Sequence, residues 1–117
     1  MSGIDYTELE PLFVGATFYG DEYEIYEVVD DVEVPVDLTG ADAKMEFRDK
    51  YDKLIETFST EDDTLQVLDN KVILPEQELK MVAGVYFSDI SLVLANGDIV
   101  PGLMKLKWTF TNPVTKR

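Results

Sequence analysis

The feature that most constrains this chain is the alternation of apolar and polar residues along most of its 117 positions. Between Ala41 and Phe47, for example, the side chains of Ala43, Met45 and Phe47 share one face if the segment is a strand. An amphipathic helix would instead need apolar residues three and four positions apart. The sequence therefore predicts short β-strands, each with one buried face and one wet face.

The first half of the chain predicts four such strands separated by polar turns. They cover residues 23–29, 32–37, 41–47 and 54–58, and Asp30-Asp31 forms the turn between the first two. Pro35 lies inside the second strand and has no N–H to donate to a ladder. We therefore expect that strand at a sheet edge or as a loose connection.

The second half continues the alternation in residues 65–68, 72–74, 85–94 and 98–110. In 85–94 the pattern predicts that Val85 and Phe87 share one face and that a one-residue slip follows them. Asn96-Gly97 is a strong hairpin signal, because both residues tolerate the positive φ of a type I′ turn. Pro101-Gly102 interrupts the last strand and is expected to kink or bulge it.

Residues 75–82 are the one candidate helix. Pro75 suits a first helical position and Ala83-Gly84 would close the segment. Two turns are long enough only for a crossover between sheets.

Strands this short, with turns every eight to twelve residues, are typical of a sandwich, and the length fits one domain. We predict an all-β fold, an antiparallel β-sandwich of seven or eight strands with one short crossover helix. The sandwich is expected to cover residues 11–113, between an N-terminal arm, 1–10, and a C-terminal tail, 114–117. Two interpretations fit the apolar N-terminal residues: a first strand on the domain's own core, favoured for 11–19, or an arm that adds a strand to a neighbouring subunit, favoured for 1–10.

The chain contains no cysteine and no histidine. Disulfides, thiolate zinc sites, histidine metal ligands and serine–histidine catalysis are therefore excluded. Acid–base chemistry would fall to carboxylates, lysines or tyrosines, but the carboxylates lie in turns or on alternating strand faces, where solvated charge is the ordinary arrangement. No glycine-rich phosphate loop is present. We expect no enzyme and no cofactor.

Acidic residues outnumber basic ones by 24 to 10, which gives a net charge of −14. This charge argues against nucleic acid and against an anionic membrane surface as partners. No basic residue precedes Lys44, so the acidic first half either pairs with basic residues of later strands or faces a basic partner. The N-terminus shows no basic region followed by an apolar stretch, so we expect no secretory signal and folding in a cytoplasm.

Two ligand classes remain as alternatives. Asp30-Asp31 and the loop at 61–63 carry the hard oxygen ligands that calcium prefers, although neither matches the spacing of an EF-hand, and we expect no metal site. Tyr19, Tyr23 and Tyr26 would suit a carbohydrate-binding platform if all three were exposed on one face.

Several short motifs occur in a characteristic order. They are Asp37-Leu38-Thr39-Gly40-Ala41, Arg48-Asp49, Ala83-Gly84-Val85-Tyr86, Asn96-Gly97 and Thr109-Phe110-Thr111-Asn112-Pro113. In this order they resemble a small family of tailed bacteriophages, an Ig-like β-sandwich related to the N-terminal domain of baseplate upper proteins. The resemblance covers residues 12–113, and departs from the family where Gly15-Ala16-Thr17 replaces a usual Gly-Asp-Thr.

The resemblance implies a structural virion protein of a tailed bacteriophage, in the tail, baseplate or neck, acting through protein–protein assembly. Head decoration is an alternative. It implies no catalytic residues, a location in the virion, homo-oligomers in the particle and other virion proteins as partners. The absence of early basic residues adds the expectation that one partner is more basic. Candidate contact residues are Ile4, Tyr6, Leu9, Leu12 and Phe13 on the arm, and Pro101, Leu103 and Met104 at the kink, where a bulge filling its own core is the alternative.

Overall fold

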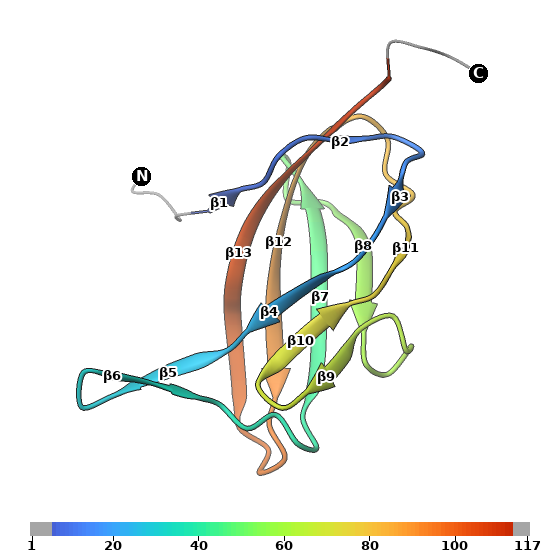
Figure 1. Ribbon diagram of the computed structural model, residues 1–117. Coiled ribbons are helices and arrows are strands. Elements are labelled where there is room, and N and C mark those ends of the chain that lie inside the picture. Colours follow the sequence, from blue (N-terminus) through green and yellow to red (C-terminus); the bar gives the residue numbers. More distant parts are fainter. Residues whose placement is uncertain (1–5, 114–117) are drawn as a thin grey trace.

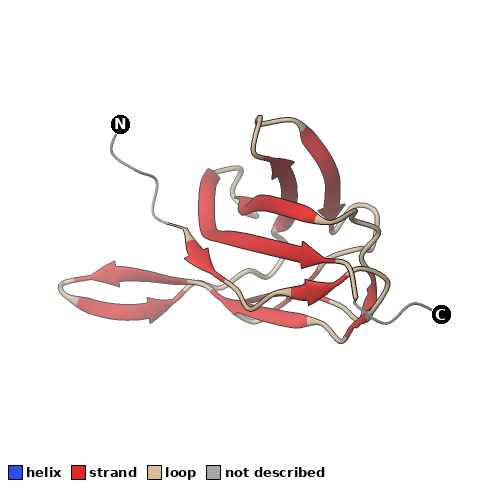
Figure 2. Ribbon diagram, turned by 90° about the horizontal axis from the view of Figure 1, so that it is seen from above, coloured by secondary structure: helices blue, strands red, loops and turns tan. Residues whose placement is uncertain are grey.

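Thirteen β-strands and no helix make up residues 6–113, which are the residues that the computed structural model describes (Figures 1 and 2). In chain order they are β1 (Thr7–Glu8), β2 (Leu12–Phe13), β3 (Thr17–Phe18), β4 (Asp21–Glu24), β5 (Tyr26–Val29), β6 (Val32–Pro35), β7 (Asp42–Asp49), β8 (Leu54–Ser59), β9 (Gln66–Leu68), β10 (Lys71–Leu74), β11 (Gln77–Glu78), β12 (Gly84–Val93) and β13 (Ile99–Thr111). The all-β class is confirmed. The strands are more numerous than expected because several connections form two-residue strands.

The strands form the two layers of a sandwich (Figure 1). The larger layer is a sheet in the order β1-β13-β12-β7-β8, to which β2 adds beside β13. The opposing layer contains the sheet β4-β10-β9 and the short pair β3-β11. Pairing is antiparallel except for β1 and β2, which run parallel to β13.

The core lies between these layers and centres on Trp108 of β13. Its ring contacts Phe47 of β7, with centroids 4.9 Å apart, and Phe18 of β3, with centroids 6.0 Å apart. The indole N–H donates to Oγ of Ser88 at 2.8 Å, and both residues are almost fully buried. A buried indole needs such a partner, because an unpaired buried donor is destabilising.

The last hairpin forms where Asn96-Gly97 predicts it, but with a different turn. The Gly97 N–H donates to the Leu94 carbonyl, and the Leu94 N–H donates to the Asp98 carbonyl, both at 2.8 Å. Only Gly97 has a positive φ, of 93°. The turn is therefore a type I turn followed by a left-handed glycine, the three-residue hairpin loop, and not the type I′ turn that the dipeptide indicated.

The predicted interruption of the last strand is confirmed as a double bulge. The register between β12 and β13 shifts twice. Steps of two residues along β12, from Ser88 to Ile90 and from Ile90 to Leu92, match steps of three residues along β13, from Leu106 to Leu103 and from Leu103 to Val100. Each step therefore leaves one extra residue in β13. Gly102 and Met104 take up the extra length with φ values of 72° and 48°.

The expected crossover helix at 75–82 is wrong. Gln77 and Glu78 form β11, which pairs with Thr17 and Phe18 of β3. Leu79 and Met81, two residues apart, are both buried, which is strand periodicity. Pairing with β3 outweighs the helical signals, because two turns of helix are marginal without a packed face.

The side chains that face the core from β12 also differ from the expectation. Tyr86, Ser88, Ile90 and Leu92 face the core without a slip, whereas Val85 and Phe87 face outward. The slip lies instead in β13.

Two buried tyrosines of the core give opposite predictions. The Tyr23 hydroxyl is buried without a hydrogen-bond partner, whereas the Tyr86 hydroxyl donates to the Val82 carbonyl at 2.8 Å. Tyr23→Phe should raise the free energy of unfolding by up to about 1 kcal/mol, and Tyr86→Phe should lower it by about 1 kcal/mol. Urea unfolding of the two variants and the parent chain measures both values. A loss of stability in Tyr23→Phe as large as that in Tyr86→Phe would contradict the prediction.

Candidate interaction surfaces

The β5–β6 hairpin projects from the sandwich and pairs with no other strand of the described residues (Figures 1 and 2). Its turn is Asp30-Asp31, and both residues have positive φ, 51° and 63°. Together with the facing pair Val29 and Val32, this defines a two-residue type I′ turn. The sequence predicted the turn, and it predicted that the strand with Pro35 lies at a sheet edge. Both predictions are confirmed.

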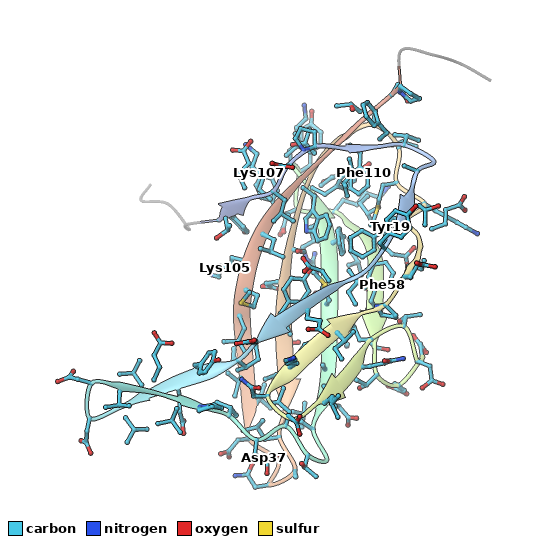
Figure 3. All side chains as sticks on the ribbon, viewed as in Figure 1. Tyr19, Asp37, Phe58, Lys105, Lys107 and Phe110 are labelled. Carbon is cyan, nitrogen blue, oxygen red and sulfur yellow. The ribbon has the colours of Figure 1, made fainter. Side chains whose placement is uncertain are left out.

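Every residue of this hairpin is exposed, and its side chains stand away from the rest of the molecule (Figure 3). Its apolar side chains are 38–70% exposed, and they are Tyr26, Val28, Val29, Val32 and Val34. Opposite residues of antiparallel strands share a face. One face therefore carries Tyr26, Val28, Glu33 and Pro35, and the other carries Glu27, Val29, Val32 and Val34. Neither face is buried in the core that residues 6–113 form.

Backbone hydrogen bonds attach the base of the hairpin to the sandwich. The Ile25 N–H donates to the Asn70 carbonyl at 2.8 Å, the Val36 N–H donates to the Ile25 carbonyl at 3.1 Å, and the Leu38 N–H donates to the Asp69 carbonyl at 2.9 Å. Ile25 and Leu38 are buried on either side of it. The hairpin is thus a projecting element with a fixed stem at the β9–β10 turn.

All the charged residues of the hairpin are acidic. Residues 21–37 contain no lysine or arginine. Within residues 6–113, no ion pair involves Glu24, Glu27, Asp30, Asp31 or Glu33. The Tyr26 hydroxyl donates to Glu24 at 2.5 Å, and this hydrogen bond raises the pKa of Tyr26.

Other early acids do contact later bases. Glu22 lies 3.5 Å from Lys71, and Glu8 lies 4.0 Å from Lys107, a residue of β13 labelled in Figure 3. These two contacts fit the explanation that early acids pair with later bases, and the explanation that early acids face a basic partner stays a prediction. Within residues 6–113, two early acids of the sandwich form ion pairs with later bases, and the acids of the hairpin form none.

The candidate contact residues of the arm lie along the chain's own large sheet where the structure describes them. The Tyr6 ring packs on Phe87 with centroids 4.8 Å apart, and the Leu9 N–H donates to the Lys107 carbonyl. Leu9 and Leu12 are partly buried against the core, whereas Phe13 is 57% exposed. Ile4 falls outside the described residues. The boundary at residue 10 and a contact with a neighbouring subunit stay predictions.

The candidate contact residues at the kink separate into two groups. Leu103 packs against the core, as the alternative interpretation of a self-filling bulge holds. Pro101 is exposed and Met104 is 37% exposed. The structure does not bring the arm and the kink together into one described surface; their contact role stays a prediction.

A shallow hollow lies on the outer face of the large sheet, lined by Tyr6, Glu46, Arg48, Phe87 and Asp89, among others. Arg48 contacts Glu46 at 3.2 Å. Partial burial raises the pKa of Asp89, the charge of Glu46 adds to this effect, and Lys105 and Arg48 oppose it. The hollow mixes both signs of charge.

The other ligand classes receive no assembled site among the described residues. Tyr23 is buried in the core while Tyr19 is 80% exposed, so the three tyrosines do not form the exposed platform that carbohydrate binding requires. No group of three or more carboxylates in residues 6–113 is placed to hold a metal ion, at Asp30-Asp31 or at residues 61–63. No helix of the described chain is long and apolar enough to cross a bilayer.

Sequence reasoning missed the hairpin as a candidate surface although it predicted both strands. The available signal was the position of the valines. Val28 and Val29 are adjacent, so they lie on opposite faces, and Val32 and Val34 then populate only one of these faces. Apolar residues on both faces of a strand pair with no basic residue nearby indicate an element outside a single core.

Asp89 gives a prediction for the dependence of stability on pH. Its folded pKa lies above the ordinary value, so its contribution to stability is fully present only below the unfolded pKa and is lost as the pH rises through the folded pKa. Asp89→Asn should therefore be more stable than the parent chain at neutral pH. The advantage should shrink as the pH falls toward the ordinary Asp value of about 3.9. Thermal unfolding by circular dichroism at several pH values measures it.

Asp62→Asn is the matched control, because Asp62 is exposed and its carboxylate makes no hydrogen bond in the described structure. It corrects for the general relief of removing one of many negative charges. Equal gains in the two variants at neutral pH would contradict a special role of the Asp89 site.

Comparison with known proteins yields one structural likeness. No family model and no curated protein sequence matches the chain. Among solved structures, the chain is similar to CopC from Methylosinus trichosporium OB3b, with 16% identity and a TM-score of 0.48 over 90% of this chain and 86% of that one. A likeness at this level carries no argument about function.

Proposed function

We propose that this chain is a structural protein of a tailed-bacteriophage particle, in its tail, baseplate or neck, and that it acts by binding other virion proteins rather than by catalysis. The observation that supports the proposal most is the projecting β5–β6 hairpin with its exposed apolar side chains. The ordered motifs that resemble the phage family support the particle assignment.

The hairpin supports a binding role because it is poorly supported in the free chain. An isolated two-stranded hairpin is only marginally stable in water. Within residues 6–113 this one pairs with no other strand, and it exposes Tyr26 and four valines. Covering apolar surface is favourable by about 25 cal/mol for each Å² removed from water. A partner that covers both faces would therefore stabilise the hairpin and bind the chain at once.

The charge of the chain supports a partner of opposite sign. Copies that each carry −14 repel one another over about 8 Å at physiological ionic strength. The six acidic side chains of residues 24–37, which include both residues at the hairpin tip, concentrate this charge on the projecting element. A more basic virion protein therefore fits the hairpin better than a bare surface of a second copy, and homo-oligomers in the particle would be held around such a partner.

The proposal predicts that the chain is part of the finished particle. Gradient-purified particles of the phage that encodes it should contain the chain in a fixed ratio to the other structural proteins, as quantified by mass spectrometry. Stripping with concentrated salt should release it, because screening weakens charge complementarity.

The matched control is a non-structural protein of the same phage, which should be lost through the gradient. Absence of the chain from particles that are otherwise complete, or turnover of a substrate by the purified chain, would contradict the proposed function.

A further inference from the structure

We infer that the free edge of β5, continued by Glu24 of β4, is a docking site for one extended segment of a partner protein. That segment carries apolar side chains opposite Tyr26 and Val28 and a lysine or arginine opposite Glu24. The inference rests on the proposed function, since it names the chemistry of the partner that the hairpin would bind. It assigns the contact to one edge of the continuous segment that β4 and β5 form.

The strand register determines which backbone groups are free. In a two-residue hairpin the residues that flank the turn, here Val29 and Val32, form the hydrogen-bonded pair, and the bonding alternates from there. The backbone groups of Val28 and Tyr26 therefore point away from β6. On the opposite edge the equivalent residues are Glu33 and Pro35, and Pro35 has no N–H. A partner strand would find two donors along β5 and one along β6.

The free edge continues from β5 into β4. The Ile25 N–H bonds Asn70 at the β9–β10 turn, so the backbone groups of its neighbour Glu24 point to the other side, away from β10. Glu24, Tyr26 and Val28 thus present their backbone groups along one unpaired edge. Long unpaired edges are ready templates for another strand, which is why proteins usually block them. Pro35 blocks the β6 edge, whereas the β5 edge contains no proline.

The side chains beside this edge set the chemistry of the partner. Glu24, Tyr26 and Val28 alternate along the chain and lie on the outer face, all exposed. Residues directly opposite in a sheet contact each other, so apolar side chains belong opposite Tyr26 and Val28. The carboxylate of Glu24 has no ion-pair partner among residues 6–113 and accepts only the hydrogen bond from Tyr26. A cation opposite it completes the complementarity.

A second copy of the hairpin fits this edge poorly. Two β5 edges brought together would combine the acidic residues of both hairpins with no base in either. Gathering these negative charges is unfavourable because no cation compensates for them. The lining of the edge therefore favours a segment from a different, basic protein, and the test below separates this occupant from a second copy and from a membrane.

The experiment is a titration of the isolated, isotopically labelled full chain with two synthetic peptides, followed by amide chemical shifts. The basic peptide is capped and has threonine at every other position. The positions between the threonines carry two valines followed by two lysines. The acidic peptide has glutamates in place of the lysines. We expect the basic peptide to shift the amides of residues 24–29 and to bind about tenfold more tightly than the acidic one. The amide signals of the exposed edge strand β8 should not shift.

A pair of proline variants isolates the backbone edge. Val28→Pro removes an outward N–H from β5, and Glu33→Pro removes the corresponding outward N–H from β6, so neither disturbs the bonds between the two strands. Val28→Pro should abolish binding of the basic peptide, and Glu33→Pro should retain it. The melting temperature of each variant confirms that the sandwich, which lies outside the hairpin, is intact.

Four outcomes would overturn the inference. They are the absence of binding at millimolar basic peptide, equal affinity for the two peptides, shifts centred on β8 or β6, and equal loss in the two proline variants. Concentration-dependent self-association through residues 24–29, or co-sedimentation with neutral phosphatidylcholine vesicles that Val28→Pro abolishes, would assign the edge to another occupant. Because the titration uses the isolated chain, its result is independent of whether the chain is found in particles.

Discussion

The sandwich depends on the burial of Trp108 between its layers. The indole ring contacts Phe47 within the large sheet and Phe18 in the opposing layer, so one side chain joins the two. Its N–H would be unpaired in an apolar core, and Ser88 supplies the acceptor at 2.8 Å. A small polar residue therefore has to face the core from β12. This requirement fixes the inward face of β12, which carries Tyr86, Ser88, Ile90 and Leu92.

The burial of Ser88 fixes the faces of the two longest strands. With Ser88 and Tyr86 inward, Phe87 faces outward on the sheet, where Tyr6 covers it. On the partner strand, Leu106 opposes Ser88, but Pro101-Gly102 prevents a regular ladder beyond it. The two bulges re-aim Leu103 and Val100 toward the core, so apolar burial is kept although the spacing is lost. The parallel pairing of β1 and β2 with β13 follows the same edge of the sheet.

These contacts show why part of the fold was predictable from the sequence and part was not. Alternation identified the segments at 41–47 and 98–110 and the turns at Asp30-Asp31 and Asn96-Gly97, because these depend on neighbouring residues. The faces of β12 were predicted wrongly because Ser88 counts as polar in any periodic pattern, although a tryptophan twenty residues away requires it inside. The strand β11 was missed because its pairing with β3 is likewise non-local. The hairpin's strands were predicted, but not that the core leaves both of their faces uncovered.

The same core also explains why the hairpin projects from the sandwich. The inward residues of β4 and its continuation end at Ile25, and the chain returns to the core at Val36, which is partly buried against it, and at Leu38, which is fully buried. The residues of β5 and β6 are all exposed and are not among the side chains that pack against the core. Their valines and acids therefore do not serve the fold. A segment that a stable core does not need, that projects from it with a fixed stem and that leaves one backbone edge unblocked has the physical properties of a binding element. If the hairpin binds as proposed, its acidity favours a partner that carries the opposite charge.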